Sequence, residues 1–381
     1  MNIDDGVFVG ATNGEGTNLT AGVKEPYKRL VNELCLLPCF AQQIIQNVTA
    51  LETGLSQPCF RVQTNKHDYF AKYLANSGAE LVANKLATEF GIAPKLIYGA
   101  GQWLITDFIT GELLVDCHLS EDEKLATTLA LLAQCHRLTK SSINRQIGQQ
   151  SSSHNNALTI PYLAIEDTLA QLFQALLPQQ PLSTNEQLLL SQLNRLMAIA
   201  KPVLQELAQT RTEVGHSNEV FCHGDANFTN VIKLANATKA DDELQYQLID
   251  FECACIAPIE YDIAMLMAVN EIESNKIAQV IALYSQHNAQ QILRQQSGPL
   301  MSKNHADKAV KIVDNLPDMT KNMDNICKHL VTRYYCLSLI INGLWYLLQY
   351  QQRNEEKYKK LANKQFLLLA NRYPETYIVI D

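Results

Sequence analysis

The chain has 381 residues, of which 47% are hydrophobic and 18% charged, a balance typical of a soluble globular protein long enough for two domains or lobes. Its net charge of −8, with no stripe of lysine and arginine, argues against a nucleic-acid partner. Ten cysteines without paired Cys-x-x-Cys spacing, the lack of a signal-peptide pattern and the lack of an apolar run of roughly 18–20 residues favour a cytoplasmic protein without membrane insertion. The oligomeric state stays open.

The first 109 residues carry mainly strand patterns. Residues 1–25 are polar and rich in Gly, Asn and Thr, which favours a flexible arm. Helices are expected over 27–39 and 79–90, and strands over 44–48, 59–63, 69–74, 95–99 and 102–108. The turn between the first two strands contains Gly54 and Ser56, and its backbone N–H groups are suited to phosphate oxygens; an ordinary hairpin turn is the alternative interpretation.

Lys72 lies on the third expected strand, and Glu80 lies in the first turn of the helix that follows. Taken alone, Lys72 is explained by a solvated position at a sheet edge. In kinases, however, a strand lysine paired with a helix glutamate holds the α- and β-phosphates of ATP. Lys72 and Glu80 are therefore candidate nucleotide-binding residues.

A Thr/Gly loop ends the β-rich part, and we expect the domain boundary at 109–111. Helices are expected next over 122–138, 160–177 and 185–209, with a polar loop over 145–158. His136 lies near the apolar face of the first of these helices. We interpret it as a buried, hydrogen-bonded core histidine.

The stretch Phe221-Cys-His-Gly-Asp225-Ala-Asn-Phe-Thr-Asn230 is the most informative part of the sequence. Strand patterns over 230–234 and 245–251, with a polar segment between them, predict a hairpin. Asp225 precedes this hairpin, Asn230 opens it and Asp250 ends it. Three oxygen-bearing side chains are therefore expected at one edge of a small sheet.

These residue types suit phosphoryl transfer, which needs a carboxylate to accept the proton of the attacking hydroxyl and oxygen ligands for Mg²⁺. Asp225 and Asn230 keep the interval between the catalytic Asp and the metal-binding Asn of protein kinases, and Asp250-Phe-Glu252 stands where the Asp-Phe-Gly triplet would. The alternative is that His-Gly-Asp is a turn and Ile-Asp-Phe a strand end. We predict Asp225 as the catalytic base, and Asn230 and Asp250 as metal ligands.

Helical patterns fill the rest of the chain, starting at 258 and then over 271–295, 306–313, 324–350 and 354–373. Asp262 is placed to brace the catalytic loop or, alternatively, to serve as an ordinary carboxylate at a helix N-terminus. Nine residues separate the triplet from Asp262, too few for the activation segment with which protein kinases dock a peptide. This spacing favours a small-molecule substrate.

Together with Gly91-Ile-Ala-Pro-Lys-Leu-Ile97 and Leu55-Ser-Gln-Pro-Cys-Phe-Arg-Val62, the catalytic stretch resembles the aminoglycoside phosphotransferase and choline kinase superfamily over roughly residues 45–373. Choline/ethanolamine kinases and thiamine kinase-like proteins are the most similar members. The resemblance implies an α+β, two-lobed protein-kinase-like fold, with a small β-rich N-lobe (1–109) and a larger, mainly helical C-lobe (110–381). It also implies ATP and Mg²⁺ as cofactors, with Ser56 near the phosphates and backbone groups of Asp107 and Ile109 at the adenine.

The helix over 337–350 is similar to the C-terminal helix that supplies an aromatic cage for a quaternary ammonium in choline and ethanolamine kinases. Trp345 matches one cage tryptophan, and Tyr346 follows it. Asn342 replaces a second cage tryptophan, and Cys253 replaces a tyrosine that usually follows the motif glutamate. Both departures put choline itself in doubt, and ordinary helix packing is the alternative role for the aromatic residues.

Glu252, Asn227 and Asn342 complete the candidate substrate contacts, with Glu252 as a counter-charge for an amine. We therefore expect an ATP-dependent small-molecule kinase that phosphorylates a hydroxyl of an amino-alcohol-type, cationic substrate. The alternatives are a thiamine kinase, an aminoglycoside phosphotransferase-like enzyme, or a catalytically silent kinase-like binding protein.

Overall fold

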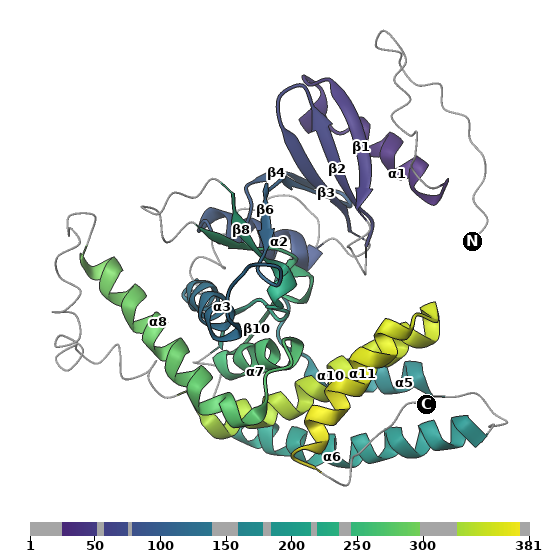
Figure 1. The fold of residues 1–381 in the computed structure, drawn as a ribbon, viewed down its shortest axis with the longest axis vertical. Coiled ribbons are helices and arrows are strands. Elements are labelled where there is room, and N and C mark those ends of the chain that lie inside the picture. Colours follow the sequence, from purple (N-terminus) through teal and green to yellow (C-terminus); the bar gives the residue numbers. More distant parts are fainter. Residues whose placement is uncertain are drawn as a thin grey trace. The chain divides into compact units, whose positions relative to one another are not determined.

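The computed structural model describes residues 25–51, 57–74, 78–138, 159–177, 184–214, 219–235, 245–297 and 326–373. The chain divides into two compact units, called here the N-terminal unit (1–77 and 94–109) and the C-terminal unit (78–93 and 110–381) (Figure 1). Residues 1–24 of the predicted arm (1–25), the turn with Ser56, the loop over 145–158 and the predicted helix over 306–313 lie outside the described residues, and Glu25 begins a helix. The division into lobes at residue 109 stays a prediction.

The N-terminal unit is an antiparallel five-stranded sheet with the strand order β1-β2-β3-β5-β4. The strands are β1 (Ile45–Leu51), β2 (Cys59–Thr64), β3 (Asp68–Tyr73), β4 (Leu96–Ala100) and β5 (Trp103–Asp107). Helix α1 (Glu25–Cys35) packs Val31 and Leu34 into the same core as Phe60 and Trp103. This helix was predicted over 27–39 but ends earlier, at Cys35, because Pro38 begins a separate 3₁₀ turn, η1 (Pro38–Phe40).

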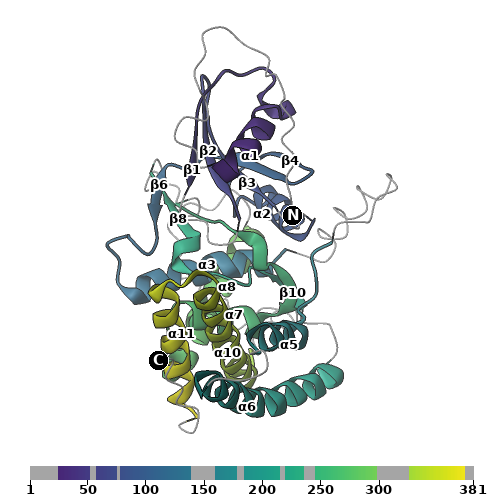
Figure 2. The same cartoon turned by 90° about the vertical axis from the view of Figure 1, so that its right-hand side faces the viewer.

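The C-terminal unit is mainly helical. Its helices are α2 (Gly78–Glu89), α3 (Glu121–His136), α5 (Ile165–Leu176), α6 (Thr184–Val214), α7 (Ile259–Val269), α8 (Ile277–Ser297), α10 (Lys328–Arg353) and α11 (Glu356–Ala370). Helix α7 is buried along most of its length and packs against α10, which also packs against α11; Figure 2 shows these three helices side by side. This apolar centre supports the strands that carry the candidate site.

Two small sheets complete the C-terminal unit. One pairs β7 (Glu219–Cys222) with β10 (Cys255–Pro258), and the other has the order β6-β8-β9, built from β6 (Gly111–Leu113), β8 (Val231–Leu234) and β9 (Tyr246–Leu248). The pairing of β8 with β9 confirms the predicted hairpin. Two 3₁₀ turns, η3 (Phe228–Asn230) and η4 (Phe251–Cys253), flank it.

The structure corrects three expectations about the C-terminal unit. Strands β6, β7 and β10 have no counterpart among the predicted elements. Helix α5 begins at Ile165 rather than 160, because Tyr162 is extended and forms a bridge to Ile256. The helix predicted over 271–295 begins instead at Ile277, after a break in which Glu271 adopts a left-handed conformation with φ of 56°.

Among the helices in the described part of the chain, none combines the length and the apolar character that crossing a bilayer requires.

Candidate active site

Strand β7 leads directly into the loop that carries Asp225. Gly224 in this loop has a φ of +77°, a conformation that L-residues rarely adopt. A Cβ atom added to Gly224 would lie 2.2 Å from the carbonyl oxygen of Cys253, which is a backbone atom and cannot move away. Glycine therefore lets the Asp225 loop approach η4, the turn that follows Asp250.

Asp262, in the first turn of α7, holds the backbone of this loop. Its carboxylate is fully buried and accepts the N–H groups of His223 and Gly224, each at 2.9 Å, and the Nε2–H of His136, also at 2.9 Å. Nδ1 of His136 lies 2.8 Å from the hydroxyl of Tyr284. These contacts confirm that Asp262 braces the loop and that His136 is a buried, hydrogen-bonded histidine.

The environment of Asp262 keeps its carboxylate charged. Burial opposes ionisation, but the hydrogen bond and charge of His136 and the N–H of Gly224 outweigh it, so the pKa of Asp262 is lowered. A fixed negative charge therefore lies under the loop, and each donated N–H makes a charge-assisted hydrogen bond to it.

His223 shapes the loop through both ring nitrogens. Nε2 donates to the carbonyl of Ile249 at 3.0 Å, and Nδ1 accepts the N–H of Asp225 at 3.2 Å. The ring lies 4.7 Å from the ring of Phe251. Burial lowers the pKa of His223, which favours the neutral ring that this bonding pattern requires. His223 thereby links Asp225 to the strand end that carries Asp250.

The structure brings Asp225, Asn230 and Asp250 together. The Nδ2 of Asn230 donates to the Oδ2 and the backbone carbonyl of Asp225, both at 3.0 Å. The N–H of Ile249 donates to the carbonyl of Asn230 at 2.9 Å, which places Asp250 next to this pair. Asp250 itself adopts a left-handed conformation with φ of 64°, a strained state that is frequent at functional sites.

The carboxyl of Asp225 titrates near neutrality. Burial raises its pKa most, the negative charges of Asp250 and Glu252 raise it further, and the hydrogen bond from Asn230 opposes the rise, with the result that the pKa reaches about 7. A carboxylate with this pKa suits a general base at physiological pH, since catalytic efficiency is greatest when the pKa lies near the working pH.

Three acidic side chains form a candidate cation site in the C-terminal unit. One carboxylate oxygen each from Glu80 on α2, Asp250 and Glu252 lies within 4.8 Å of the others. Asn230, whose Nδ2 donates to Asp225, stays the further ligand that the sequence predicts, through its amide oxygen. These hard oxygen donors fit Mg²⁺, which prefers carboxylate and carbonyl ligands. The pairing of Glu80 with Lys72 stays a prediction, and the structure adds that Glu80 lies close to two acidic residues of the catalytic motif.

The other predicted nucleotide residues lie in the N-terminal unit. Lys72 is the second-to-last residue of β3, between Cys59 and Leu104 on the neighbouring strands, and is 4% exposed. Asp107 ends β5, and its N–H donates to the carbonyl of Lys95 at 3.0 Å, so its carbonyl is the group it could offer to adenine. Ile109 follows in a segment without regular secondary structure. The roles of these residues and of Ser56 toward ATP stay predictions.

Helix α10 carries the predicted substrate residues. The Nδ2 of Asn342 donates to the Sδ of Met265 on α7 at 3.6 Å. Trp345 contacts Tyr346 and Tyr358 edge-on, with ring centroids 5.3 and 6.4 Å apart. Burial and the nearby charge of Asp225 raise the pKa of Tyr346 to about 12. Tyr346 therefore lies within electrostatic range of the candidate base.

Asn227 and Glu252 have different positions in the site. The side chain of Asn227 caps η3 by accepting the N–H of Thr229 at 3.0 Å, and its Nδ2 lies 3.4 Å from the carbonyl of Val269. Glu252 lies in η4 and is partly exposed. Asn227 thus has a structural role within the loop, and the role of Glu252 as a counter-charge stays a prediction.

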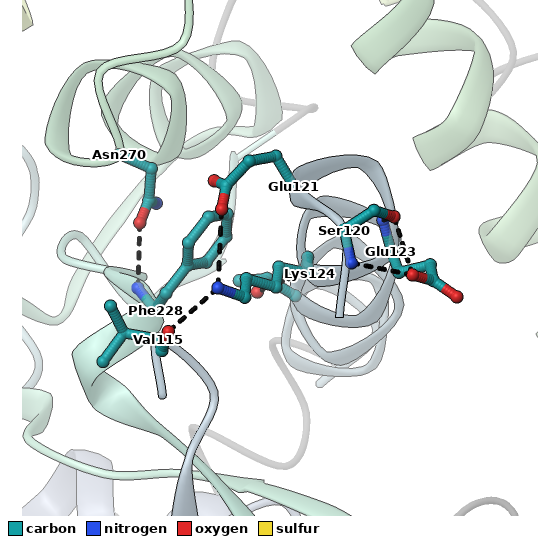
Figure 3. Close-up of polar contacts among 8 residues, drawn as sticks. Val115, Ser120, Glu121, Glu123, Lys124, Phe228 and Asn270 are labelled. Carbon is teal, nitrogen blue, oxygen red and sulfur yellow. Dashed lines mark hydrogen bonds and ion pairs between the residues drawn. The ribbon is translucent and has the colours of Figure 1, made fainter. Parts of the chain in front are cut away.

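Sequence reasoning missed Asn270, which follows the last residue of α7. Its side chain bonds to the backbone of Ala226 and Phe228, inside the catalytic motif, and Figure 3 shows the contact with Phe228. No local pattern identifies it, since 42 residues separate Asn270 from Phe228.

A small antiparallel sheet, a helical C-terminal unit and a loop that joins an Asp to an Asn five residues later define the class of kinase-like phosphotransferases. The sequence profile of the choline/ethanolamine kinase family matches residues 50–369. The chain therefore belongs to this family, within the superfamily predicted from the sequence. It is a phosphotransferase that acts on a hydroxyl group of a small molecule, and the family implies the use of ATP.

Solved structures share the two-lobed kinase-like fold. The chain is similar to an ethanolamine kinase of Plasmodium vivax (14% identity, TM-score 0.51, covering 87% of this chain and 84% of that one). It is also similar to a choline kinase of Streptococcus pneumoniae (14%, 0.54, 91% and 99%) and to a spectinomycin phosphotransferase in complex with ADP and spectinomycin (14%, 0.50, 89% and 97%). No curated protein matches the chain. These likenesses confirm the predicted α+β fold.

Proposed function

We propose that the protein transfers the γ-phosphate of ATP to the hydroxyl of a small cationic amino alcohol, a choline- or ethanolamine-like substrate, with Asp225 as the general base. The main observation behind this proposal is the hydrogen bond of 3.0 Å from Asn230 to Asp225. Burial and the neighbouring charges of Asp250 and Glu252 raise the pKa of Asp225 to about 7. This arrangement supports a carboxylate that accepts a proton at neutral pH.

Asp225 orients the substrate hydroxyl and takes its proton as the oxygen attacks the γ-phosphorus. The hydrogen bond that His223 accepts from the N–H of Asp225 and the charge of Asp262 fix the loop, so that Asp225 need not reorganise during the reaction. Asn230 and Asp250 would hold Mg²⁺, with Glu80 and Glu252 nearby. When bound, the ion neutralises the charge of the β- and γ-phosphates. Lys72 would hold the α- and β-phosphates.

Acidic and aromatic groups support a cationic substrate. The carboxylates of Asp225, Asp250 and Glu252 lie together, and Tyr346 is within electrostatic range of Asp225. The ring of Trp345, in contact with Tyr346, offers a π-face that attracts a desolvated cation by about 2 kcal/mol. The Nδ2 of Asn342 donates to Met265, and its amide oxygen can accept a hydrogen bond. This acceptor suits an amine with N–H donors at least as well as a trimethylammonium group.

A panel of acceptors tests this proposal. The purified protein is incubated with MgATP and choline, ethanolamine, thiamine or spectinomycin, and both ADP and the phosphorylated product are measured. We expect turnover with choline or ethanolamine that depends on Mg²⁺. Turnover confined to thiamine or spectinomycin would replace the amino-alcohol assignment, and ADP release without any phosphorylated acceptor would refute the transfer reaction.

A variant pair connects the activity to the site. Asp225→Ala should lose transfer and keep nucleotide binding, because the phosphates are held by other residues. Asp116→Ala removes an equally charged, exposed side chain of the same unit and should retain wild-type activity.

A further inference from the structure

The side chain of Asn270 makes three hydrogen bonds to backbone groups. Its Oδ1 accepts the N–H of Phe228 at 2.9 Å, and its Nδ2 donates to the carbonyls of Ala226 at 3.1 Å and Leu266 at 2.8 Å. Figure 3 shows Asn270 directed at the N–H of Phe228 from the end of α7. One amide thus joins the C-terminus of a buried helix to two peptide groups of the catalytic loop.

The peptide groups held by Asn270 lie between the two residues that the reaction uses. Ala226 directly follows Asp225, and Phe228 opens η3, the turn that ends at Asn230. The spacing of Ala226 and Phe228 therefore sets how Asn230 approaches Asp225, whose carboxylate accepts its Nδ2 at 3.0 Å. A side chain that fixes both groups fixes the geometry of the pair.

The opposite side of Phe228 is held as well. Its carbonyl accepts the N–H of Val115 at 3.2 Å, and the carbonyl of Val115 accepts the Nζ of Lys124 on α3 at 2.9 Å (Figure 3). Phe228 is thus held through both its N–H and its carbonyl. The contacts from α3 cannot replace Asn270, because Asn270 also bonds to the carbonyl of Ala226.

The turn that bears Asn270 is itself rigidly supported. Glu271 has a positive φ of 56° and pairs with Lys364 on α11 at 2.9 Å. The hydroxyl of Tyr335 on α10 donates to the carbonyl of Ile272 at 2.7 Å, and the Nε2 of Gln365 on α11 donates to the carbonyl of Ala268 at 3.0 Å. Contacts from α10 and α11 therefore hold Asn270 where it meets the loop.

We infer that Asn270 is a positioning residue for phosphoryl transfer, acting through Ala226 and Phe228 on the relative placement of Asp225 and Asn230. The inference rests on the proposed roles of Asp225 and Asn230. It assigns Asn270 no contact with the substrate. A displacement of about 1 Å in a reacting group costs about 100-fold in rate, so loss of the Asn270 contacts should lower kcat by about 10- to 100-fold.

The test compares Asn270→Ala with Ser120→Ala. Ser120 forms the capping box of α3 with Glu123, so its loss lowers the stability of the same unit through a side chain that bonds to Glu123 and not to the catalytic loop. Initial rates are measured with MgATP and the best acceptor of the panel, and kcat is expressed per nucleotide-binding site so that unfolded protein does not count. Hydrogen exchange of peptides covering 221–234 is followed in parallel.

We expect Asn270→Ala to lower kcat by about 10- to 100-fold, to leave the KM for ATP within about twofold, and to speed exchange in 221–234, while Ser120→Ala keeps wild-type values of all three. A kcat for Asn270→Ala within about threefold of wild type, or an equal loss in Ser120→Ala, would overturn the inference. If Asn270→Ala does not fold, Asn270→Asp takes its place, because the carboxylate keeps an acceptor for the N–H of Phe228 but cannot donate to the carbonyl of Ala226. An unchanged kcat for Asn270→Asp would also overturn the inference.

Asp225→Asn separates this inference from the proposed function. If Asp225→Asn retains wild-type transfer, the proposed function fails, whatever Asn270→Ala does. If Asp225→Asn is inactive and Asn270→Ala is fully active, only the positioning role of Asn270 is refuted.

Discussion

Replacing Asp262 by Asn removes the charge that supports the catalytic loop while keeping the shape of the side chain. The native carboxylate accepts three donors at 2.9 Å: the N–H groups of His223 and Gly224 and the Nε2–H of His136. An Asn amide offers one oxygen. In either orientation, at least one of the three donors therefore faces an NH₂ group.

The structure gives the size of the effect. A lost charge-assisted hydrogen bond contributes about 1.5–3 kcal/mol, and a buried N–H left without an acceptor adds about 1–3 kcal/mol. Because Asp262 is fully buried, little solvent can replace these contacts. We expect Asp262→Asn to lower the free energy of unfolding by about 3–5 kcal/mol, the range found when one partner of a buried ion pair is removed.

Urea unfolding monitored by circular dichroism measures this change, and the rate with MgATP reports on the loop. Glu260→Gln is the matched control, since it alters an equal charge in the first turn of α7 and keeps an acceptor for the N–H of Cys327, 3.1 Å away. The control should stay within about 0.5 kcal/mol of wild type. If Asp262→Asn unfolds within about 1 kcal/mol of wild type and keeps its kcat, the brace described for Asp262 is wrong.

Three further perturbations have defined outcomes. In the folded protein Asp225 keeps its proton up to about pH 7, whereas in the unfolded chain it releases it near 3.8, so ionised Asp225 destabilises the native state at high pH. The full pKa shift corresponds to about 4 kcal/mol, and the partial exposure of Asp225 reduces this to about 2 kcal/mol. Asp225→Asn should therefore raise the free energy of unfolding by about 2 kcal/mol at pH 8 and by little at pH 4. Equal effects at both pH values in urea titrations would contradict this pH dependence. A Cβ at Gly343 would lie 2.4 Å from the buried ring of Phe366, so Gly343→Ala should lower the free energy of unfolding by about 1–3 kcal/mol, measured by thermal melts. Adding Phe366→Leu should recover part of the loss. An unchanged Tm for Gly343→Ala would count against the α10–α11 packing. Lys72→Ala should raise the KM for ATP at least about tenfold and leave that of the alcohol unchanged, while the exposed Lys66→Ala behaves as wild type; an unaltered KM for ATP removes Lys72 from nucleotide binding.

The sequence predicted the parts of the site that short-range patterns define. The hairpin of β8 and β9 follows from two β-forming runs with a polar segment between them, and its pairing brings Asp250 close to Asn230. The brace from Asp262 was predicted from the resemblance to the superfamily and not from a short-range pattern, since Asp262 lies 39 positions after His223. The hairpin, in contrast, depends on residues close together in the chain.

Other features depend on contacts that no local pattern encodes. Strands β7 and β10 have four residues each, and they exist because they pair with each other, with Cys222 opposite Cys255. Just after the end of α7, Glu271 has a positive φ of 56° and pairs with Lys364 on α11, far away in the sequence. Since such positions arise from tertiary contacts, the role of Asn270 becomes visible in the structure alone.

The most direct test of the account follows the phosphoryl group itself. Wild type and Asp225→Ala are incubated with ATP labelled in the γ-phosphate, Mg²⁺ and either ethanolamine or choline, and the label in the phosphorylated alcohol is counted against ADP. We predict one labelled alcohol per ADP for wild type and a rate about 10²- to 10⁴-fold lower for Asp225→Ala, which still binds ATP. Label that reaches water instead of the alcohol, or transfer by Asp225→Ala at nearly the wild-type rate, would contradict the claim that Asp225 activates an alcohol for attack on ATP.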